Sequence, residues 1–189
     1  MIEGKMGKLI YIILGVLSMV FLFTQAKTSK SVNFTFENIS PSQPDINLSD
    51  YHGKVILLVN TASKCGFTKQ YSELEALYQE YKDKGLVVIG VPSNDFMNQE
   101  PGTEEDILAF CQLNYGVTFP LTKKYVVSDK DAHPFFVFAT EQLGYWSKPK
   151  WNFQKYLIDR QGHLVTYFFP TTSPQSSKLI QAVERELNK

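Results

Sequence analysis

Two apolar runs with a helical pattern between them constrain the fold of this chain more than any other feature of its sequence. Lys54 to Val59 is a continuous apolar run after a glycine, and Leu86 to Val91 is a second run, which ends at Pro92. Runs of this length without polar alternation are typical of strands that are buried on both faces of a sheet. Between the runs, apolar residues recur at helical spacing until Gly85 closes the helix, namely at Tyr71, Leu74, Leu77, Tyr78 and Tyr81. The pattern predicts a strand, a helix and a second strand at the centre of the fold.

Shorter segments extend this arrangement at both ends. Val32 to Phe36 alternates between apolar and polar residues and predicts a strand, whereas Asn38 to Ser49 is rich in turn-forming residues. Near the C-terminus, Lys155 to Ile158 and Leu164 to Phe168 flank the turn residues Asp159 to Gly162, which predicts a hairpin. Because strands alternate with helices first and a hairpin follows late, we expect an α/β fold with a central sheet of mixed direction flanked by helices.

Three further helices are predicted from caps and from apolar spacing. They run from Thr103 to about Gln112, from Phe135 to Gln142 and from Leu179 to Leu187. Thr103 suits an N-cap because Asp106 follows three residues later, and Pro134 suits the first turn of the next helix. With 189 residues, of which 43% are hydrophobic, the chain fits one compact domain, which we place at residues 32–189.

The N-terminal segment has the layout of an export signal. Two lysines precede an apolar stretch from Leu9 to Phe23, and small residues allow cleavage after Ala26. A retained membrane anchor is the alternative, since the uncharged run of residues 9–26 would span roughly 27 Å as a helix against a hydrocarbon core of about 30 Å. We expect residues 1–26 to be a signal peptide or a membrane anchor, residues 27–31 to be a linker, and the domain to work outside the cytosol.

Charge and histidine spacing exclude two classes of function. The chain carries 19 basic and 19 acidic residues, and no basic stripe alternates with aromatic residues, so we expect no nucleic-acid binding. The histidines His52, His133 and His163 follow no ligand spacing and do not indicate a metal site. The spacing G-x-G-x-x-G is also absent, so we expect neither a metal nor an organic cofactor.

Cys65 lies in a polar turn between the first predicted buried strand and the helix that follows it. A thiol at this place is close to helix N-terminal amides, which favour the thiolate, and the neighbouring Lys64 acts in the same direction. A dithiol oxidoreductase would carry a second cysteine three residues later, where this chain has Thr68. A single activated thiol indicates chemistry on an oxidant, although a structural disulfide with Cys111 is the alternative in an exported protein.

Three segments of the chain resemble the signature segments of the glutathione peroxidase family, in the family's order and spacing. They are Asn60-Thr61-Ala62-Ser63-Lys64-Cys65-Gly66-Phe67-Thr68, Asn98-Gln99-Glu100-Pro101-Gly102 and Trp151-Asn152-Phe153-Gln154-Lys155-Tyr156-Leu157. The resemblance covers about Val32 to Lys189 and implies a thioredoxin-like fold. It also implies a peroxidase that reduces hydrogen peroxide and organic or lipid hydroperoxides in antioxidant defence.

The resemblance implies a catalytic tetrad of Cys65, Gln99, Trp151 and Asn152. The last three offer neutral N–H groups, which can stabilise a thiolate and the leaving group of a peroxide. The segment around Cys111 resembles the thioredoxin-dependent members, in which the matching cysteine is the resolving thiol. We therefore expect a Cys65 sulfenic acid that Cys111 converts to a disulfide, and a thioredoxin-like dithiol protein or glutathione that reduces this disulfide.

The sequence departs from the family pattern at Ser93, Asp95 and Met97. Of these changes, Asp95 puts a carboxylate near the site, where it would weaken the stability of a thiolate. The stretch between Gly116 and Trp151 lacks the long insertion through which tetrameric members assemble, so we expect a monomer.

Other readings remain open on the sequence. A redox sensor would pass oxidation from Cys65 to a partner, and a thioredoxin-like binding domain would carry a structural bridge between Cys65 and Cys111. Cys111 also shares a helix face with apolar residues, as a buried thiol without a redox role would. The two arginines, Arg160 and Arg185, lie in a predicted turn and in the last helix. Because glutathione carboxylates are best recognised by arginine, we expect a thioredoxin-like protein to be the better electron donor.

Overall fold

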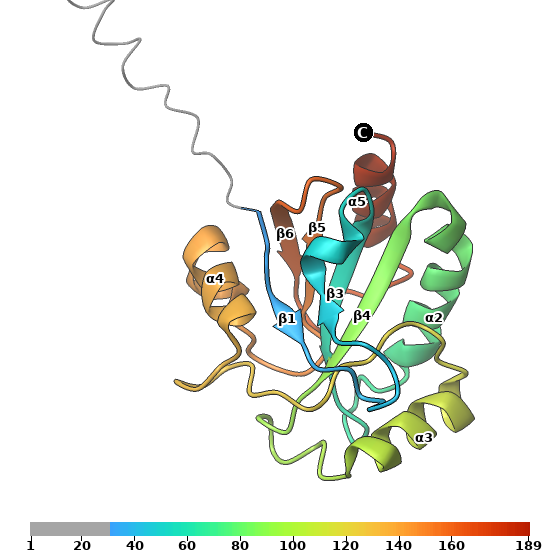
Figure 1. The fold of residues 1–189 in the computed structure, drawn as a ribbon, viewed down its shortest axis with the longest axis vertical. Helices are drawn as coiled ribbons and strands as arrows, with labels where there is room; N and C mark the ends of the chain where they lie inside the picture. The colour runs from blue at the N-terminus through green and yellow to red at the C-terminus, as the bar shows by residue number, and fades with distance from the viewer. Residues whose placement is uncertain (1–30) are drawn as a thin grey trace, which may run out of the picture.

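The computed structural model describes residues 31–189 and contains a four-stranded sheet of mixed direction (Figure 1). Its strands lie in the order β4 (Leu86–Pro92), β3 (Val55–Thr61), β5 (Lys155–Ile158) and β6 (Leu164–Phe168). β3 and β4 are parallel, whereas β5 pairs antiparallel with both β3 and β6. The predicted mixed sheet and the predicted C-terminal hairpin are therefore both confirmed.

Helices cover both faces of this sheet. α2 (Gln70–Tyr81) and α5 (Ser177–Leu187) lie on one face, α4 (Pro134–Leu143) lies on the other, and α3 (Glu104–Tyr115) packs near one end of the sheet (Figure 1). The side chains of β3 alternate between the two layers as the pleat requires. Val55, Leu57 and Val59 join the core under α2 and α5, and Ile56 and Leu58 join the core under α4. Every residue of β3 is buried, which explains its unbroken apolar sequence.

The N-terminal part of the domain differs from the prediction. Only Thr35–Phe36 of the expected strand pairs, as β1, and its partner β2 (Ile46–Asn47) lies within the segment predicted to be a turn. Phe36 and Ile46 are both buried, so tertiary packing selects this pair although the polar neighbours of Ile46 favour a turn. A 3-10 turn (Leu48–Tyr51) then leads into β3.

The helix ends follow the predicted caps. The 3-10 turn Lys82–Lys84 extends α2, and Gly85 closes it with a φ of 105°, a conformation that glycine adopts without strain. Thr103 and Asp106 form a capping box at the start of α3. A last 3-10 turn (Tyr145–Ser147) follows α4.

The described chain begins at the end of the sheet that lies away from Cys65. Ser31 pairs with His163 beside the β5–β6 turn, next to the first residues of β3, whereas Cys65 follows the last residues of β3. The predicted signal peptide or membrane anchor lies outside the described residues. Among residues 31–189, no helix has both the length and the apolar character that crossing a membrane requires.

We expect His133 to make the stability of the domain depend on pH. Its Nδ1 accepts a hydrogen bond from the Phe135 N–H at the start of α4, Nε2 is 3.0 Å from the Thr35 carbonyl oxygen, and the ring stacks on Phe36 at 3.9 Å. Burial lowers the pKa of His133 below its ordinary value of 6.5, against a smaller opposite effect of the Thr35 carbonyl. The stabilisation is therefore complete above pH 6.5 and is lost as the pH falls below 6.5 through the folded pKa.

We expect the free energy of unfolding of the wild-type protein to decrease more steeply between pH 7 and pH 5 than that of His133→Asn. Asparagine can cap α4 but does not titrate, so the variant keeps the cap and loses this pH dependence. Urea unfolding of both proteins at matched pH values measures the difference. Parallel pH profiles would contradict the assignment.

Candidate functional site

Cys65 lies in a tight turn that follows β3. The Cys65 N–H donates to Thr68 Oγ1 at 2.9 Å, and the same hydroxyl donates to the Ala62 carbonyl oxygen at 2.9 Å. The Thr68 N–H in turn donates to the Cys65 carbonyl oxygen at 3.0 Å. Thr68, which replaces the second cysteine of a dithiol motif, thus fixes the conformation of the Cys65 turn.

The sulfur of Cys65 is half-buried and receives one main-chain hydrogen bond. The Phe67 N–H donates to Cys65 Sγ at 3.4 Å. α2 begins only at Gln70, so this amide belongs to the turn before the helix and not to the helix N-terminus that we expected to stabilise the thiolate. Lys64 is exposed beside it.

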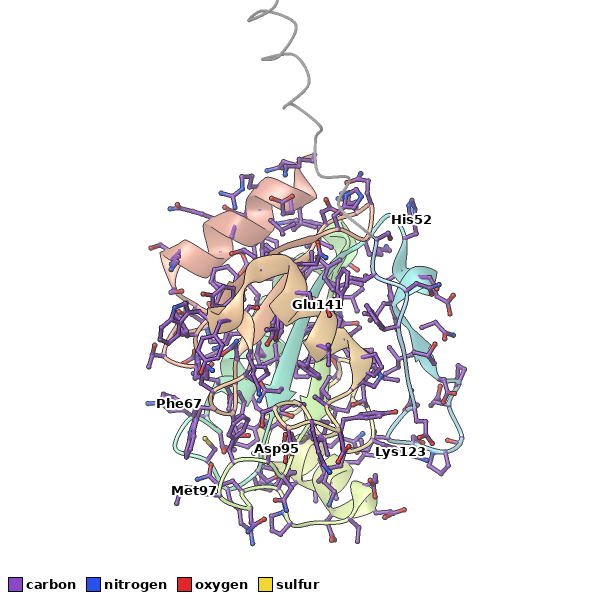
Figure 2. The ribbon with its side chains drawn as sticks, turned by 90° about the vertical axis from the view of Figure 1, so that its left-hand side faces the viewer. His52, Phe67, Asp95, Met97, Lys123 and Glu141 are labelled. Carbon is purple, nitrogen blue, oxygen red and sulfur yellow. The ribbon has the colours of Figure 1, made fainter. Side chains whose placement is uncertain are left out.

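The loop after β4 contacts the Cys65 turn through its main chain. The Lys64 N–H donates to the Gln99 carbonyl oxygen at 3.0 Å. The Asn94 side chain fixes this loop, because its Oδ1 accepts from the Glu100 N–H and its Nδ2 donates to Asn98. Met97 and Asn98 both have positive φ values, 55° and 52°. Figure 2 shows Met97 at the same end of the molecule as Phe67.

The third signature segment meets this loop before β5. Asn152 is fully buried, and its Nδ2 donates to Gln99 Oε1 at 3.0 Å. Trp151 is half-buried, and its ring lies 5.8 Å from that of Phe96. The structure therefore brings Gln99, Trp151 and Asn152 together from two loops that lie 53 residues apart.

Cys65 is not hydrogen-bonded to these three side chains. Within residues 31–189, the Phe67 amide is the one group that donates to Cys65 Sγ. In the same part of the chain, Gln99 Nε2 and Trp151 Nε1 donate to no protein group. These N–H groups are therefore available to a bound molecule, whereas Asn152 holds the Gln99 amide in place.

Cys111 lies in the core and forms no disulfide with Cys65; both are free thiols. It is fully buried on α3, beside the hydroxyl of Tyr71. Burial raises the pKa of Cys111 to about 11, and Glu100 adds to the increase, while Tyr71 opposes it. Cys111 is therefore a neutral and unreactive thiol at neutral pH in this conformation.

The charged side chains of Asp95 and Lys155 both have structural contacts. Asp95 Oδ2 accepts hydrogen bonds from the N–H groups of Val127 and Ser128, at 2.7 and 2.9 Å, so its carboxylate is bound to that segment. No hydrogen bond joins Asp95 to Cys65 in the described part of the chain, where we had expected an effect on the thiolate. Lys155 is buried, donates to the carbonyl oxygens of Pro170 and Thr172, and has its pKa lowered by burial to about 7.

The histidines do not gather at this site. Figure 2 shows His52 at the opposite end of the molecule from Phe67 and Met97. Across residues 31–189, no three His, Cys, Asp or Glu side chains form a cluster that could hold a metal ion.

Sequence reasoning missed three contributors to this geometry. The Phe67 amide acts through its main chain, and no residue type would indicate such a role. Thr68 was noted only for not being cysteine, although Ser and Thr hydroxyls commonly bond to main-chain groups in turns. Asn60 was read as the first residue of the polar turn that carries Cys65, whereas it lies within β3 and makes the contacts considered below.

The fold and the site together define a class of protein. A mixed α/β sheet carries one half-buried cysteine directly after a central strand, and free amide and indole N–H groups lie on neighbouring loops. This is a thiol-based oxidoreductase without a dithiol motif.

Comparison with known proteins gives the family. Residues 33–140 match the family model described as glutathione peroxidase. Glutathione peroxidase homolog BsaA of Halalkalibacterium halodurans is 57% identical over 129 residues, which cover 67% of this chain and 82% of the relative. Glutathione peroxidase-like peroxiredoxin 2 of Saccharomyces cerevisiae is 43% identical over 173 residues, covering 89% and 98%. The chain belongs to the glutathione peroxidase family and is a peroxidase.

The structural comparison agrees with the sequence comparison. The crystal structure of Trgpx in apo form superposes with a TM-score of 0.67 at 34% identity, covering 86% of this chain and 98% of that one. The expected thioredoxin-like fold is therefore confirmed.

Proposed function

We propose that Cys65 is the nucleophile of a thiol peroxidase that reduces hydrogen peroxide and organic hydroperoxides. The observation that carries this proposal is the position of Cys65, whose sulfur accepts the Phe67 N–H while the neighbouring Gln99 and Trp151 N–H groups stay free. In the first step, the Cys65 thiolate attacks the terminal oxygen of ROOH and the O–O bond breaks. Cys65 becomes a sulfenic acid, and the RO⁻ that leaves takes up a proton to form the alcohol.

The neutral donors act mainly on the leaving group in this scheme. Charge moves from sulfur to the departing oxygen during the reaction, and N–H groups fixed in place stabilise it without a large reorganisation. Gln99 and Trp151 present these donors. The hydrogen bond from Asn152 occupies Gln99 Oε1 and leaves the Gln99 Nε2 hydrogens for the peroxide.

Cys111 completes the cycle as the resolving thiol. Its sulfur attacks the Cys65 sulfenic sulfur, a disulfide forms, and the hydroxyl leaves as water with the Cys111 proton. An external dithiol then reduces the disulfide to two thiols. The raised pKa of Cys111 keeps this thiol protected from other oxidants until the helix that carries it moves.

A thioredoxin-like dithiol protein is the reductant that we propose. Arg160 donates to the carbonyl oxygens of Gly53, Lys84 and Leu187, at the end of the sheet away from Cys65. Arg185 lies on α5 and pairs with Glu186. Neither guanidinium is placed to bind the carboxylates of glutathione at Cys65.

The proposal is tested by steady-state peroxide reduction with two reductants. At equal thiol concentration, we expect a thioredoxin-like dithiol protein to support at least about tenfold faster turnover than glutathione, because dedicated charge-assisted contacts to glutathione are missing. Equal or faster turnover with glutathione would contradict the proposed reductant, and no turnover with either would contradict the proposed function.

We also propose that the protein is exported and works as a monomer in antioxidant defence. The apolar segment of residues 9–26 motivates the export, either with cleavage after Ala26 or with retention as an anchor. If the segment is retained as an anchor, it attaches the domain to the membrane at Ser31. Cys65 lies at the other end of the seven-residue strand β3, which favours access of soluble hydroperoxides to this thiol. The short stretch between Gly116 and Trp151 favours the monomer.

A further inference from the structure

Asn60 links the strand that precedes Cys65 to the segment that carries Trp151 and Asn152. It lies at the end of β3, five residues before Cys65, and is fully buried. The regular β3–β5 ladder stops one residue earlier, at the pair Val59 and Lys155. Asn60 thus faces a part of the chain that is not a strand.

Both the main chain and the side chain of Asn60 bind this segment. The Asn60 N–H donates to the Gln154 carbonyl oxygen at 3.2 Å, and the Asn60 carbonyl oxygen accepts from the Phe153 N–H at 2.6 Å. Asn60 Nδ2 donates to the Trp151 carbonyl oxygen at 3.1 Å, and Oδ1 accepts from the Gln154 N–H at 3.0 Å. All four bonds reach residues 151–154.

Beyond Val59 the main chains of β3 and β5 no longer form a regular ladder of hydrogen bonds. The two hydrogen bonds of the Asn60 side chain join the two segments in its place. Phe153 has a φ of 68°, the left-handed region that a bulky residue rarely adopts, and this interrupts the extended conformation before β5. Without the Asn60 amide, the Gln154 N–H would be buried without a partner, which is costly. The Asn60 amide therefore fits a backbone conformation in which Trp151 and Asn152 contact Phe96 and Gln99 on the loop after β4.

We propose that Asn60 is a positioning residue for peroxide reduction, which holds Trp151 and Asn152 in register with Cys65. This inference rests on the proposed function of Cys65. Asn60 touches neither the sulfur nor a peroxide. It acts by tying the main chain of residues 151–154 to the same strand that leads into the Cys65 turn.

Two reactions of Cys65 separate this role from a merely structural one. Peroxide reduction releases an alkoxide or hydroxide, which needs the fixed N–H donors. Alkylation by iodoacetamide releases iodide and needs only the thiolate. If Trp151 and Asn152 are displaced, peroxide reduction should therefore slow more than alkylation by iodoacetamide.

The experiment compares both rate constants in Asn60→Leu and in the matched control Thr61→Val. Leucine has a similar size but no amide, whereas Thr61 is equally buried on the same strand and its hydroxyl has no hydrogen-bond partner. We expect the ratio of the peroxide rate to the iodoacetamide rate to fall at least about tenfold in Asn60→Leu and to stay within about twofold in Thr61→Val. If Asn60→Leu does not fold, Asn60→Ser provides the same comparison.

Trp151 gives an independent readout. The protein contains two tryptophans, so Trp146→Phe leaves Trp151 as the single fluorophore. In that background, we expect Asn60→Leu to increase the quenching of Trp151 by acrylamide.

Three outcomes would overturn the inference: an unchanged rate ratio in the Asn60 variant, an equal decrease of both rates, or an equal effect of Thr61→Val. Failure of the proposed function looks different. In that case the otherwise wild-type protein itself would show no reaction of peroxide at Cys65.

Discussion

Cys65→Ser is expected to lower peroxide reduction by at least about 10³-fold while the protein stays folded. A serine hydroxyl stays protonated at neutral pH, so the substitution removes the nucleophile and leaves the size of the side chain almost unchanged. Cys65 is half-buried in a turn and its sulfur accepts one hydrogen bond, so the loss of stability should be small. Steady-state consumption of hydrogen peroxide measures the first effect and thermal unfolding measures the second.

Thr68→Ser is a suitable control for this measurement. It keeps the hydroxyl that bridges the Cys65 N–H and the Ala62 carbonyl oxygen, and it leaves Cys65 in place. Its activity should remain within about tenfold of the wild-type activity, because the bridging hydrogen bonds can still form. Substantial turnover by Cys65→Ser would show that another group reduces the peroxide.

Cys111→Ser is expected to abolish turnover with a thioredoxin-like dithiol but to retain one stoichiometric reduction of peroxide per molecule. The first step needs only Cys65, whereas the disulfide that the reductant recognises needs both cysteines. A rapid-mixing assay with one equivalent of peroxide measures the single turnover. Full steady-state activity of Cys111→Ser would contradict the resolving role.

Disulfide formation should also open α3. Cys111 is fully buried in the reduced protein, and Ile107 is the one other buried residue of this 12-residue helix. A pocket of about 320 Å³ lies between Ser63 and Lys64 on one side and α3 on the other, so this side of the helix is not packed against the Cys65 turn. A helix of this length depends on tertiary packing, and withdrawal of Cys111 removes one of its two fully buried side chains.

The chain that follows α3 limits the extent of this opening. Gly116 follows the helix with a φ of 63° and can act as a hinge. Beyond it, the N–H and the hydroxyl of Thr118 donate to the Glu75 carboxylate on α2, at 2.8 and 2.7 Å. We therefore expect amide exchange to increase in residues 104–116 on oxidation and to stay unchanged beyond Thr118.

Cys111→Ser also provides the control for the amide exchange experiment. Oxidised Cys111→Ser cannot form the disulfide, so its residues 104–116 should remain protected. Equal protection of α3 in the reduced and oxidised wild-type protein would show that the disulfide forms without opening the helix.

The sheet and the helices could be predicted from the sequence because local signals and burial agree there. β5 and β6 match their predicted bounds, and Gly85 and Thr103 cap their helices as expected. The β1–β2 pair could not be predicted, since the burial of Phe36 and Ile46 depends on tertiary contacts that override the local turn signal.

The candidate site residues could be named from the sequence, but their contacts could not. The resemblance to the family's signature segments implied Gln99, Trp151 and Asn152, but not the hydrogen bond from Asn152 to Gln99. The sequence also placed Cys65 at a helix N-terminus, whereas the donor is the Phe67 amide in the preceding turn. Which amide points at the sulfur depends on backbone dihedral angles, and no residue type specifies them here.

Trapping of the sulfenic acid with dimedone would show directly whether Cys65 is the nucleophile. Cys111→Ser would be treated with one equivalent of hydrogen peroxide in the presence of dimedone, and its peptides would be analysed by mass spectrometry. We expect close to one dimedone adduct per molecule, located on the peptide that contains Cys65. An unmodified Cys65 after the peroxide has been consumed would contradict it.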